Sequence, residues 1–356
     1  MKKQKWTVLF MAVLFFGMAL LCWIKPDQEF SDRERRYLAQ MPELNMKTVL
    51  SGTFMSKFEE YALDQFPMRD AFMKLYQKAS TTKDQNGMYL ADGHIVSMQY
   101  PMDEDGMERA AEIFRTIHGL YAENSNVYLA IIPDKNAFLG NEHGYLAMDY
   151  EAFYEKMKTE TGFHYIQIDD LLEIEDYYKT DGHWDQGRIV DVARRLAQGM
   201  GTDISWSYDT NILQVPFYGA YYGQLATNLP ADTIQYYTND VIDGMKVFDH
   251  QNNKEIDVYD MEKANGKDPY EMFLGGPLSL VTIENPACDN GKELVVFRDS
   301  FGSSIAPLLA EGYEKVTLVD IRYIPSKQVC QMIDFDGADV LFLYSTLVLN
   351  NAETLK

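Results

Sequence analysis

The sequence predicts an α/β domain with a mostly parallel sheet and helices on both faces, preceded by one N-terminal transmembrane helix. Short apolar runs with the length of buried strands alternate with stretches whose apolar residues recur at helical spacing. The chain also opens on an uninterrupted apolar run that is long enough to cross a bilayer. Between these features, residues 203–285 are rich in Tyr, Thr and Asn and predict a β-rich, antiparallel insertion or lid.

The N-terminal segment, residues 1–25, has the features of an uncleaved membrane anchor. Lys2, Lys3 and Lys5 precede an apolar run from Trp6 to Ile24, with a tryptophan near each end. Because basic flanks stay in the cytoplasm, the main domain is expected on the extracytoplasmic side of the cell membrane. The alternative is a cleaved signal peptide, whose apolar core is normally shorter and is followed by small residues. The stretch before Cys22 lacks them.

Residues 26–50 are charged and interrupted by prolines, which predicts a juxtamembrane linker before a domain over 51–356. A helical pattern over 53–78 should break at Pro67, because proline lacks the N–H that a helix interior needs. Residues 87–96 predict a hairpin that turns at Asp92-Gly93. Further predicted elements are helices over 110–121, 153–158 and from 188, and strands over 127–132 and 165–168.

The α/β pattern returns after the insertion. Apolar runs over 294–297, 315–319 and 340–344 predict strands, and helical patterns follow the first of them and cover about 327–333. Within the insertion, 233–237 and 255–259 alternate as half-buried strands do.

Composition excludes some classes of function. The 356 residues carry a net charge of −22, which would repel nucleic acid. Three cysteines have neither the spacing of a zinc site nor that of a disulfide framework. Cys288 and Cys330 either pair after export or stay as free thiols. We expect no cofactor and no metal.

The stretch Leu294–Ser304 combines a buried strand, a polar turn and a helical pattern. Ser300 lies in the turn, where a side chain is lifted off the sheet edge toward a substrate. The N–H groups at the start of the helix are suited to stabilise an oxyanion. Spacing alone does not distinguish this nucleophile from an ordinary N-cap serine.

Thr180-Asp-Gly-His-Trp184 is the second dense polar motif. His183 is a candidate general base, and Asp181 is the carboxylate that would orient its imidazole. Two alternatives compete with this interpretation. Asp181 acts only as an N-cap, or Asp181, His183 and Asp185 form part of a metal site, which no second His or Cys cluster supports.

The two motifs, in this order, resemble the DHHW protein family, which is related to the SGNH-hydrolase-like proteins of alginate O-acetylation. The resemblance implies an SGNH-hydrolase-like domain with Ser300 as nucleophile, His183 as base and Asp181 as its partner. For the asparagine that usually completes an oxyanion hole, Asn350 and Asn351 are candidates. Other matching stretches are 64–70, 132–135, 217–219, 273–276 and 318–323.

The leading hypothesis is a membrane-anchored O-acyltransferase that moves acetyl groups onto a cell-surface glycan. Its acyl group would come from a multi-spanning membrane acyltransferase, which often accompanies the relatives. A carbohydrate esterase with the same triad and a non-catalytic glycan-binding envelope protein are the alternatives. Candidate substrate-binding residues are Trp184, Arg298, Lys135, Tyr218 and Tyr221, although the tyrosines have the composition of core packing as well.

Overall fold

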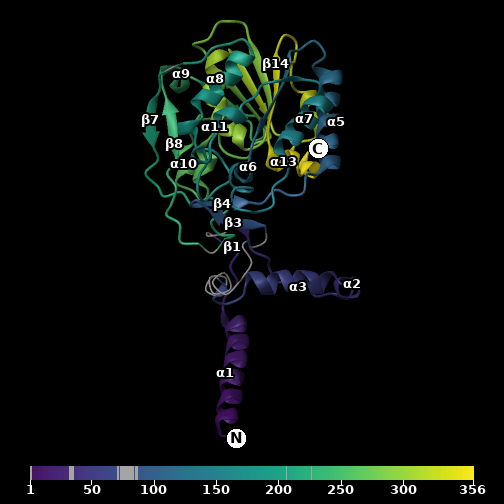
Figure 1. Ribbon diagram of the computed structural model, residues 1–356, viewed down its shortest axis with the longest axis vertical. Coiled ribbons are helices and arrows are strands. Elements are labelled where there is room, and N and C mark those ends of the chain that lie inside the picture. The colour runs from purple at the N-terminus through teal and green to yellow at the C-terminus, as the bar shows by residue number, and fades with distance from the viewer. Residues whose placement is uncertain are drawn as a thin grey trace. The chain divides into compact units, whose positions relative to one another are not determined.

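The computed structural model describes residues 2–31, 36–69, 72, 84, 87–205, 207–225 and 227–356 (Figure 1). The chain divides into two compact units. One comprises Met1–Gln85 with Tyr222–Asn228, and the other comprises Asn86–Tyr221 with Leu229–Lys356. The helix over 53–64 belongs to the first unit, and the linker over 26–50 and the domain from residue 51 stay predictions.

The larger unit is built on an eight-stranded sheet among the described residues, in the order β10-β9-β11-β13-β12-β14-β5-β6. Strands from β13 to β6 pair in parallel, and β11, β9 and β10 add an antiparallel edge. The predicted α/β class is confirmed. The strands are β5 Val127–Ile132, β6 His164–Tyr165, β9 Lys246–Asp249, β10 Lys254–Ile256, β11 Leu280–Glu284, β12 Glu293–Arg298, β13 Lys315–Val319 and β14 Asp339–Ser345.

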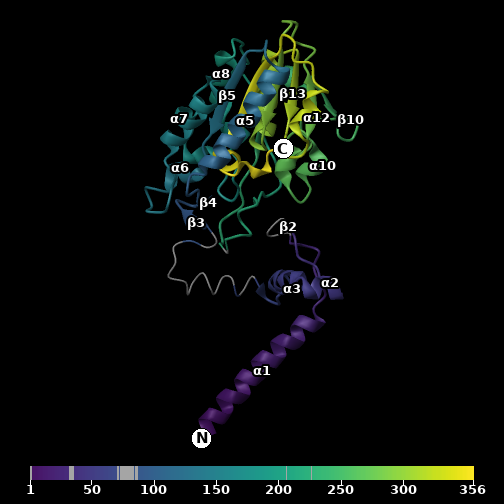
Figure 2. The ribbon, with the colours of Figure 1, turned by 90° about the vertical axis from the view of Figure 1, so that its right-hand side faces the viewer.

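The central strands are apolar throughout because both faces of the sheet are covered. Alternate residues enter different cores: Leu341 and Leu343 pack on one face, and Val340 and Phe342 on the other. Helices cover both faces, as predicted (Figures 1 and 2). α8 Val190–Gly199 and α11 Phe301–Leu309 cover the first, and α5 Glu104–Tyr121, α7 Tyr150–Thr161, α12 Ser326–Cys330 and α13 Thr346–Leu349 the second.

The predicted hairpin is formed by β3 Met88–Ala91 and β4 His94–Ser97. Its turn residues have positive φ, 45° at Asp92 and 78° at Gly93, as a tight hairpin turn requires. Strands within 203–285 are antiparallel, but β9 to β11 extend the main sheet, and only β7 Asp209–Ile212 and β8 Gln235–Thr238 form a separate pair. Short helices complete the unit: α6 Lys135–Leu139, α9 Asp240–Asp243 and α10 Met261–Ala264.

The N-terminal unit contains α1 Lys2–Ile24, β1 Phe30–Ser31, β2 Arg36–Tyr37, α2 Met46–Leu50 and α3 Thr53–Asp64. In the described part of the chain, α1 alone is long and apolar enough to cross a membrane, a property that anchors and signal sequences share. α3 ends shortly before Pro67, and most of the helix predicted beyond it lies outside the described residues. The three cysteines are free.

Candidate active site

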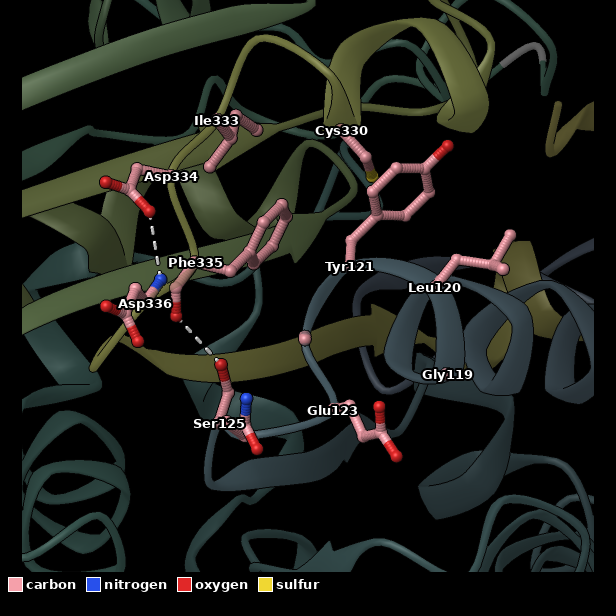
Figure 3. A pocket seen from close by; sticks show the side chains of 12 residues that line it. Gly119, Leu120, Tyr121, Glu123, Ser125, Cys330, Ile333, Asp334, Phe335 and Asp336 are labelled. Atoms are coloured by element: carbon pink, nitrogen blue, oxygen red, sulfur yellow. Dashed lines mark hydrogen bonds between the residues drawn. The ribbon is translucent and has the colours of Figure 1, made fainter.

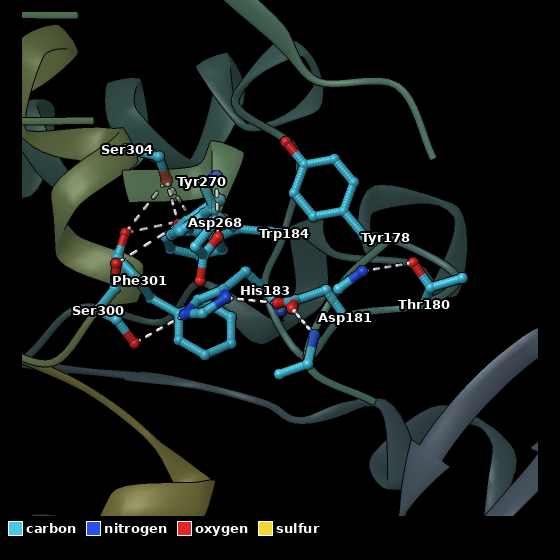
Figure 4. A network of polar contacts seen from close by, with 12 residues as sticks. Tyr178, Thr180, Asp181, His183, Trp184, Asp268, Tyr270, Ser300, Phe301 and Ser304 are labelled. Atoms are coloured by element: carbon cyan, nitrogen blue, oxygen red, sulfur yellow. Dashed lines mark hydrogen bonds and ion pairs between the residues drawn. The ribbon is translucent and has the colours of Figure 1, made fainter. Parts of the chain in front are cut away.

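Ser300 lies at the carboxyl edge of the parallel strands, where β12 ends and α11 begins. It occupies the N-cap position, yet its hydroxyl makes no capping hydrogen bond. Instead, its Oγ lies 2.7 Å from Nε2 of His183 (Figure 4). The side chain is therefore used for a contact with an imidazole and not for capping the helix.

His183 and Asp181 complete a three-residue relay. Nδ1 of His183 lies 2.5 Å from Oδ1 of Asp181, so the carboxylate fixes the imidazole with its Nε2 toward Ser300 (Figure 4). Burial acts to raise the pKa of Asp181, but the His183 charge and hydrogen bonds from His183 and Ala220 hold it well below its usual range. Asp181 thus stays ionised, which is the state that a partner of a general base would need.

A second acid, Asp232, holds the loop that carries His183. Its carboxylate accepts hydrogen bonds from the backbone N–H groups of Lys179 and Thr180, each at 2.8 Å, and from the Thr180 hydroxyl. The Thr180 hydroxyl oxygen in turn accepts from the N–H of Gly219 at 2.9 Å. The loop before Asp181 is therefore fixed by side-chain contacts from a distant segment.

Gly219 allows a close approach to Asp181 that no other residue would. A Cβ built on Gly219 would lie 2.2 Å from the Cβ of Asp181. This approach lets the next residue, Ala220, donate its N–H to Oδ2 of Asp181 at 2.7 Å. Glycine at this position is thus needed for the carboxylate to receive its second partner.

Aromatic rings set the orientation of the imidazole. Tyr270 stacks on the ring of His183 with centroids 4.1 Å apart and 15° between the planes. Its hydroxyl donates to Oγ of Ser304 at 3.0 Å, and Nε1 of Trp184 donates to the same oxygen at 2.9 Å. Ser304 of α11 therefore holds both Trp184, the neighbour of His183, and Tyr270, the ring that stacks on His183. The side chain of His183 remains 22% exposed, so the site is open to a substrate.

Asp299 ties the turn that carries Ser300 to the neighbouring strand. Its Oδ1 accepts from the N–H of Phe301 at 3.0 Å, and its Oδ2 accepts from the N–H and hydroxyl of Ser345 at 2.8 and 2.6 Å. The N–H of Gly302 is also engaged, by the carbonyl of Asp299. The backbone N–H of Ser300 itself donates to no acceptor in the described residues.

Two candidate substrate-binding residues are displaced from that role by burial. The side chains of Trp184 and Arg298 are 0% and 1% exposed, so neither presents a surface to a substrate. Trp184 packs against Phe301, and Arg298 lies 3.5 Å from Asp320 and donates to the carbonyl of Leu278. Both residues form buried contacts next to the segments that carry His183 and Ser300.

The other three candidates lie around the His183 loop. Lys135 is buried, and its Nζ donates to the carbonyl of Tyr178 at 2.9 Å and lies 5.3 Å from the ring of Tyr221. Burial lowers the pKa of Lys135 to about 7, although nearby carboxylates act to raise it. Tyr221 is half-buried with its hydroxyl near Gly182, and Tyr218 is exposed.

The two asparagines expected to complete an oxyanion hole form their hydrogen bonds with residues other than Ser300. Asn350 accepts from the N–H of Asp103 and donates to the carbonyl of Pro101, so its amide fixes that loop. Asn351 is exposed, and its carbonyl accepts from the Thr354 hydroxyl. Neither observation supports a catalytic asparagine.

A metal centre is not supported by the described residues, which contain no group of three His, Cys, Asp or Glu side chains able to hold an ion. Asp185, the third residue of that alternative, points elsewhere. Its carboxylate accepts from Tyr178, Gly187 and Gln235, and it caps the short 3-10 turn Gln186–Arg188 that precedes α8.

A hollow of about 400 Å³ lies at the opposite edge of the sheet, beside the start of β5 and β14 (Figure 3). Its lining, Gly119–Ser125 with Cys330 and Ile333–Asp336, contains no candidate nucleophile with a base beside it. Burial raises the pKa of the Cys330 thiol to about 12, which makes it unreactive.

Residues 145–319 match the profile of the DHHW protein family. The resemblance expected from the motifs is therefore confirmed, and Asp181, His183 and Ser300 all lie within the match. Among curated proteins, none matches the sequence.

Two solved proteins share the fold with TM-scores above 0.5. A DHHW family protein from Eubacterium siraeum is 23% identical with a TM-score of 0.59, over 76% of this chain and 95% of that one. Bacillus cereus PatB1 is 18% identical, TM-score 0.58, over 74% and 96%, and has also been solved with a sulfonyl adduct. The O-acetyltransferase domain of Pseudomonas putida AlgJ matches at a TM-score of 0.45, with 14% identity over 74% and 92%.

Sequence reasoning did not identify Asp232, Tyr270 or Ser304. Gly219 lies in a stretch that carried the family resemblance, but nothing in the motif indicated its contact with Asp181. These residues act through contacts with segments far along the chain, which local patterns do not show.

Proposed function

We propose that this protein is a membrane-anchored, extracytoplasmic O-acyltransferase that transfers acetyl groups to a cell-surface polysaccharide through an acyl-Ser300 intermediate. The observation that carries the proposal is the relay from Asp181 through His183 to a serine hydroxyl that does not cap its helix. An ordinary N-cap serine would have no such partner. A non-catalytic protein would have no need of the relay.

The reaction has two halves that use the same groups. Oγ of Ser300 attacks the acyl carbon of a donor ester while Nε2 of His183 takes its proton, and the tetrahedral intermediate expels an alkoxide that receives this proton. An acceptor hydroxyl then gives its proton to His183 and attacks the acyl-Ser300 carbonyl. The acyl group moves to the acceptor, and the proton returns from His183 to Ser300.

The oxyanion of each intermediate needs N–H donors in a fixed position. We assign one of them to the backbone of Ser300, because the N–H groups of Phe301 and Gly302 already donate to Asp299. The charge of the imidazolium is stabilised by Asp181, whose low pKa keeps it ionised throughout.

Residues beside the relay support the proposed substrate, and α1 supports the proposed location. Tyr218 and Tyr221 belong to the segment that wraps Asp181, and rings of this kind stack on sugars. α1 would hold the domain at the outer face of the membrane, with residues 26–50 as its linker and a multi-spanning acyltransferase as the acyl source.

The test uses purified full-length protein and a chromogenic acetyl ester. The wild type should release the chromophore, Ser300→Ala and His183→Ala should lose this activity, and Ser303→Ala on the same helix should keep it. A sulfonyl fluoride should add one sulfonyl group to Ser300, as the adduct of PatB1 suggests. The proposal fails if no ester is turned over or if the Ser300 variant is as active as wild type.

Transfer and hydrolysis share the relay and differ in the acceptor. The partly exposed His183 admits water, which is the observation that favours a carbohydrate esterase as the second candidate. An oligosaccharide acceptor separates them by mass spectrometry. Acetylated oligosaccharide supports the transferase, and free acetate alone supports the esterase. Membrane fractionation tests the anchor: a shortened, soluble chain would mean that α1 is cleaved.

A further inference from the structure

The described residues between 41 and 72 present apolar side chains that no core of the N-terminal unit covers. Neither α2 nor α3 contains a buried residue. Helices this short are marginal in water unless an apolar face packs against something. Large exposed side chains here are Met41, Leu44, Met46, Val49, Leu50, Met55, Leu63, Met68 and Phe72.

α3 has an aromatic stripe along one side, and its opposite side carries glutamates together with Leu63. At 100° per residue, Phe54, Phe58 and Tyr61 fall on one side, with Met55 at its border. Glu59 and Glu60 fall outside this apolar stripe. Such a helix lies along a boundary between an apolar and an aqueous medium.

Hydrogen bonds hold the end of α3 beside the point where the chain leaves α1. The side-chain oxygen of Gln65 accepts a hydrogen bond from the N–H of Gln28 at 3.0 Å, and the side-chain amide of Gln65 donates to the carbonyl of Gln28 at 2.8 Å. The hydroxyl of Tyr61 donates to Asp27 at 2.9 Å, and Nζ of Lys25 lies 3.4 Å from the Gln65 carbonyl. If α1 spans a membrane, these hydrogen bonds place α3 at the surface of that membrane.

Residues of the apolar face of α3 and residues of α1 line the same hollow. This hollow has a volume of about 760 Å³ and is lined by Ala19 and Cys22 of α1 and by Phe58, Tyr61 and Ala62 of α3. Its lining is mainly apolar, and Lys25 and Asp27 belong to it as well. The apolar side of α3 thus faces a hollow that is also lined by the apolar helix α1.

We propose that α3 lies in the interfacial layer of the outer leaflet, with its apolar face on the acyl chains and lipid filling the hollow beside α1. This inference depends on the membrane anchoring proposed above, and not on the acyl transfer. α3 lacks the basic face of helices that bind membranes from solution. It does not need one, because α1 already holds it at the bilayer at high effective concentration.

The experiment labels single cysteines in the full chain, reconstituted in phosphatidylcholine vesicles. Cys22→Ser and Cys288→Ser remove the accessible thiols, and buried Cys330 is kept. An environment-sensitive fluorophore is attached to Met55→Cys at the border of the apolar face or to Glu60→Cys outside it as the matched control. Quenching is measured with iodide in the water and with a nitroxide near the lipid headgroups.

At Met55→Cys we expect lipid quenching at least threefold stronger than at Glu60→Cys, and the reverse order for iodide. Equal accessibility to iodide at both positions would overturn the proposal. Protection of Met55→Cys from both quenchers would also overturn it, because a protein surface would then cover this face. Flotation of the vesicles separates these outcomes from failed anchoring, and ester turnover on the same samples reports the proposed chemistry independently.

Discussion

The His183 loop and the helices α2 and α3 differ in whether their side chains find contacts within their own unit. Around His183, the polar groups of Asp181, Asp232 and Ser304 all find partners within the larger unit. In α2 and α3 no side chain is buried, and the apolar faces have no core of their own. The geometry of the His183 loop is thus held by contacts within its own unit, whereas the interfacial position proposed for α3 would supply the cover that α2 and α3 lack.

After the loss expected for Ser300→Ala and His183→Ala, the largest effect should come from Asp181→Asn. The amide is nearly isosteric but cannot stabilise an imidazolium, and it accepts poorly from Nδ1 of His183, so turnover of the acetyl ester should fall by about 10³- to 10⁴-fold. Steady-state kinetics measures this. Asp191→Asn, on the exposed side of α8, is the control and should match wild type. A loss below tenfold at Asp181 would mean that the relay is not used.

A smaller loss is expected from Gly219→Ala. The added methyl group would press on Asp181 and displace the carboxylate from Nδ1 of His183, which should lower kcat by about 100-fold while the protein stays folded. Gly119→Ala in α5, which has open space around it, is the matched control. Unchanged kcat would show that the close approach has no catalytic consequence.

Lys135 lies beside the His183 loop, and Lys135→Met should change how the free energy of unfolding depends on pH. In wild type, burial lowers the pKa of Lys135 to about 7, while the unfolded chain keeps the ordinary value of 10.5. The unfolded state therefore binds more protons above pH 7, and the free energy of unfolding rises with pH between about 7 and 9. Urea unfolding at several pH values should show this rise in wild type and a weaker one in the variant. Parallel curves would contradict it.

Tyr270→Phe should have a modest effect. The ring still stacks on His183, but the hydroxyl no longer donates to Ser304, so stability should fall by about 1 kcal/mol. The rate of ester turnover should change less than tenfold. A loss as large as that of Asp181→Asn would indicate a direct part for the hydroxyl in the chemistry.

The smallest effect on turnover is expected in the N-terminal unit. Phe58→Ser weakens the apolar face of α3, yet turnover of a small soluble ester should stay within about twofold of wild type. The contrast between the two regions would be broken if this variant lost activity in detergent solution, where no bilayer is present.

The sequence was most informative where one local pattern determines the element. β5 and β13 have the predicted limits, because runs of apolar residues buried on both faces are distinctive. The same reasoning brought Ser300, His183 and Asp181 into one hypothesis, since strand ends and loops carry reactive side chains. The family resemblance supported grouping the three residues as a triad, and the structure then gave the distances between them.

Contacts between distant segments explain what sequence reasoning missed. Trp184 stands beside His183 in the motif, but only the position of α11 shows that its ring is buried. Asp232 has no local feature that links it to Thr180, 52 residues away. The strand expected over 165–168 ends at Tyr165, because pairing with β5 continues for two residues only.

The base and its acid sit two residues apart on one loop, whereas the serine comes from another part of the chain. A separation of these two segments would therefore switch off the hydroxyl and leave the imidazole–carboxylate pair intact. In the enzyme proposed above, the idle and the working state would therefore share the same strongly deshielded ring proton in an NMR spectrum.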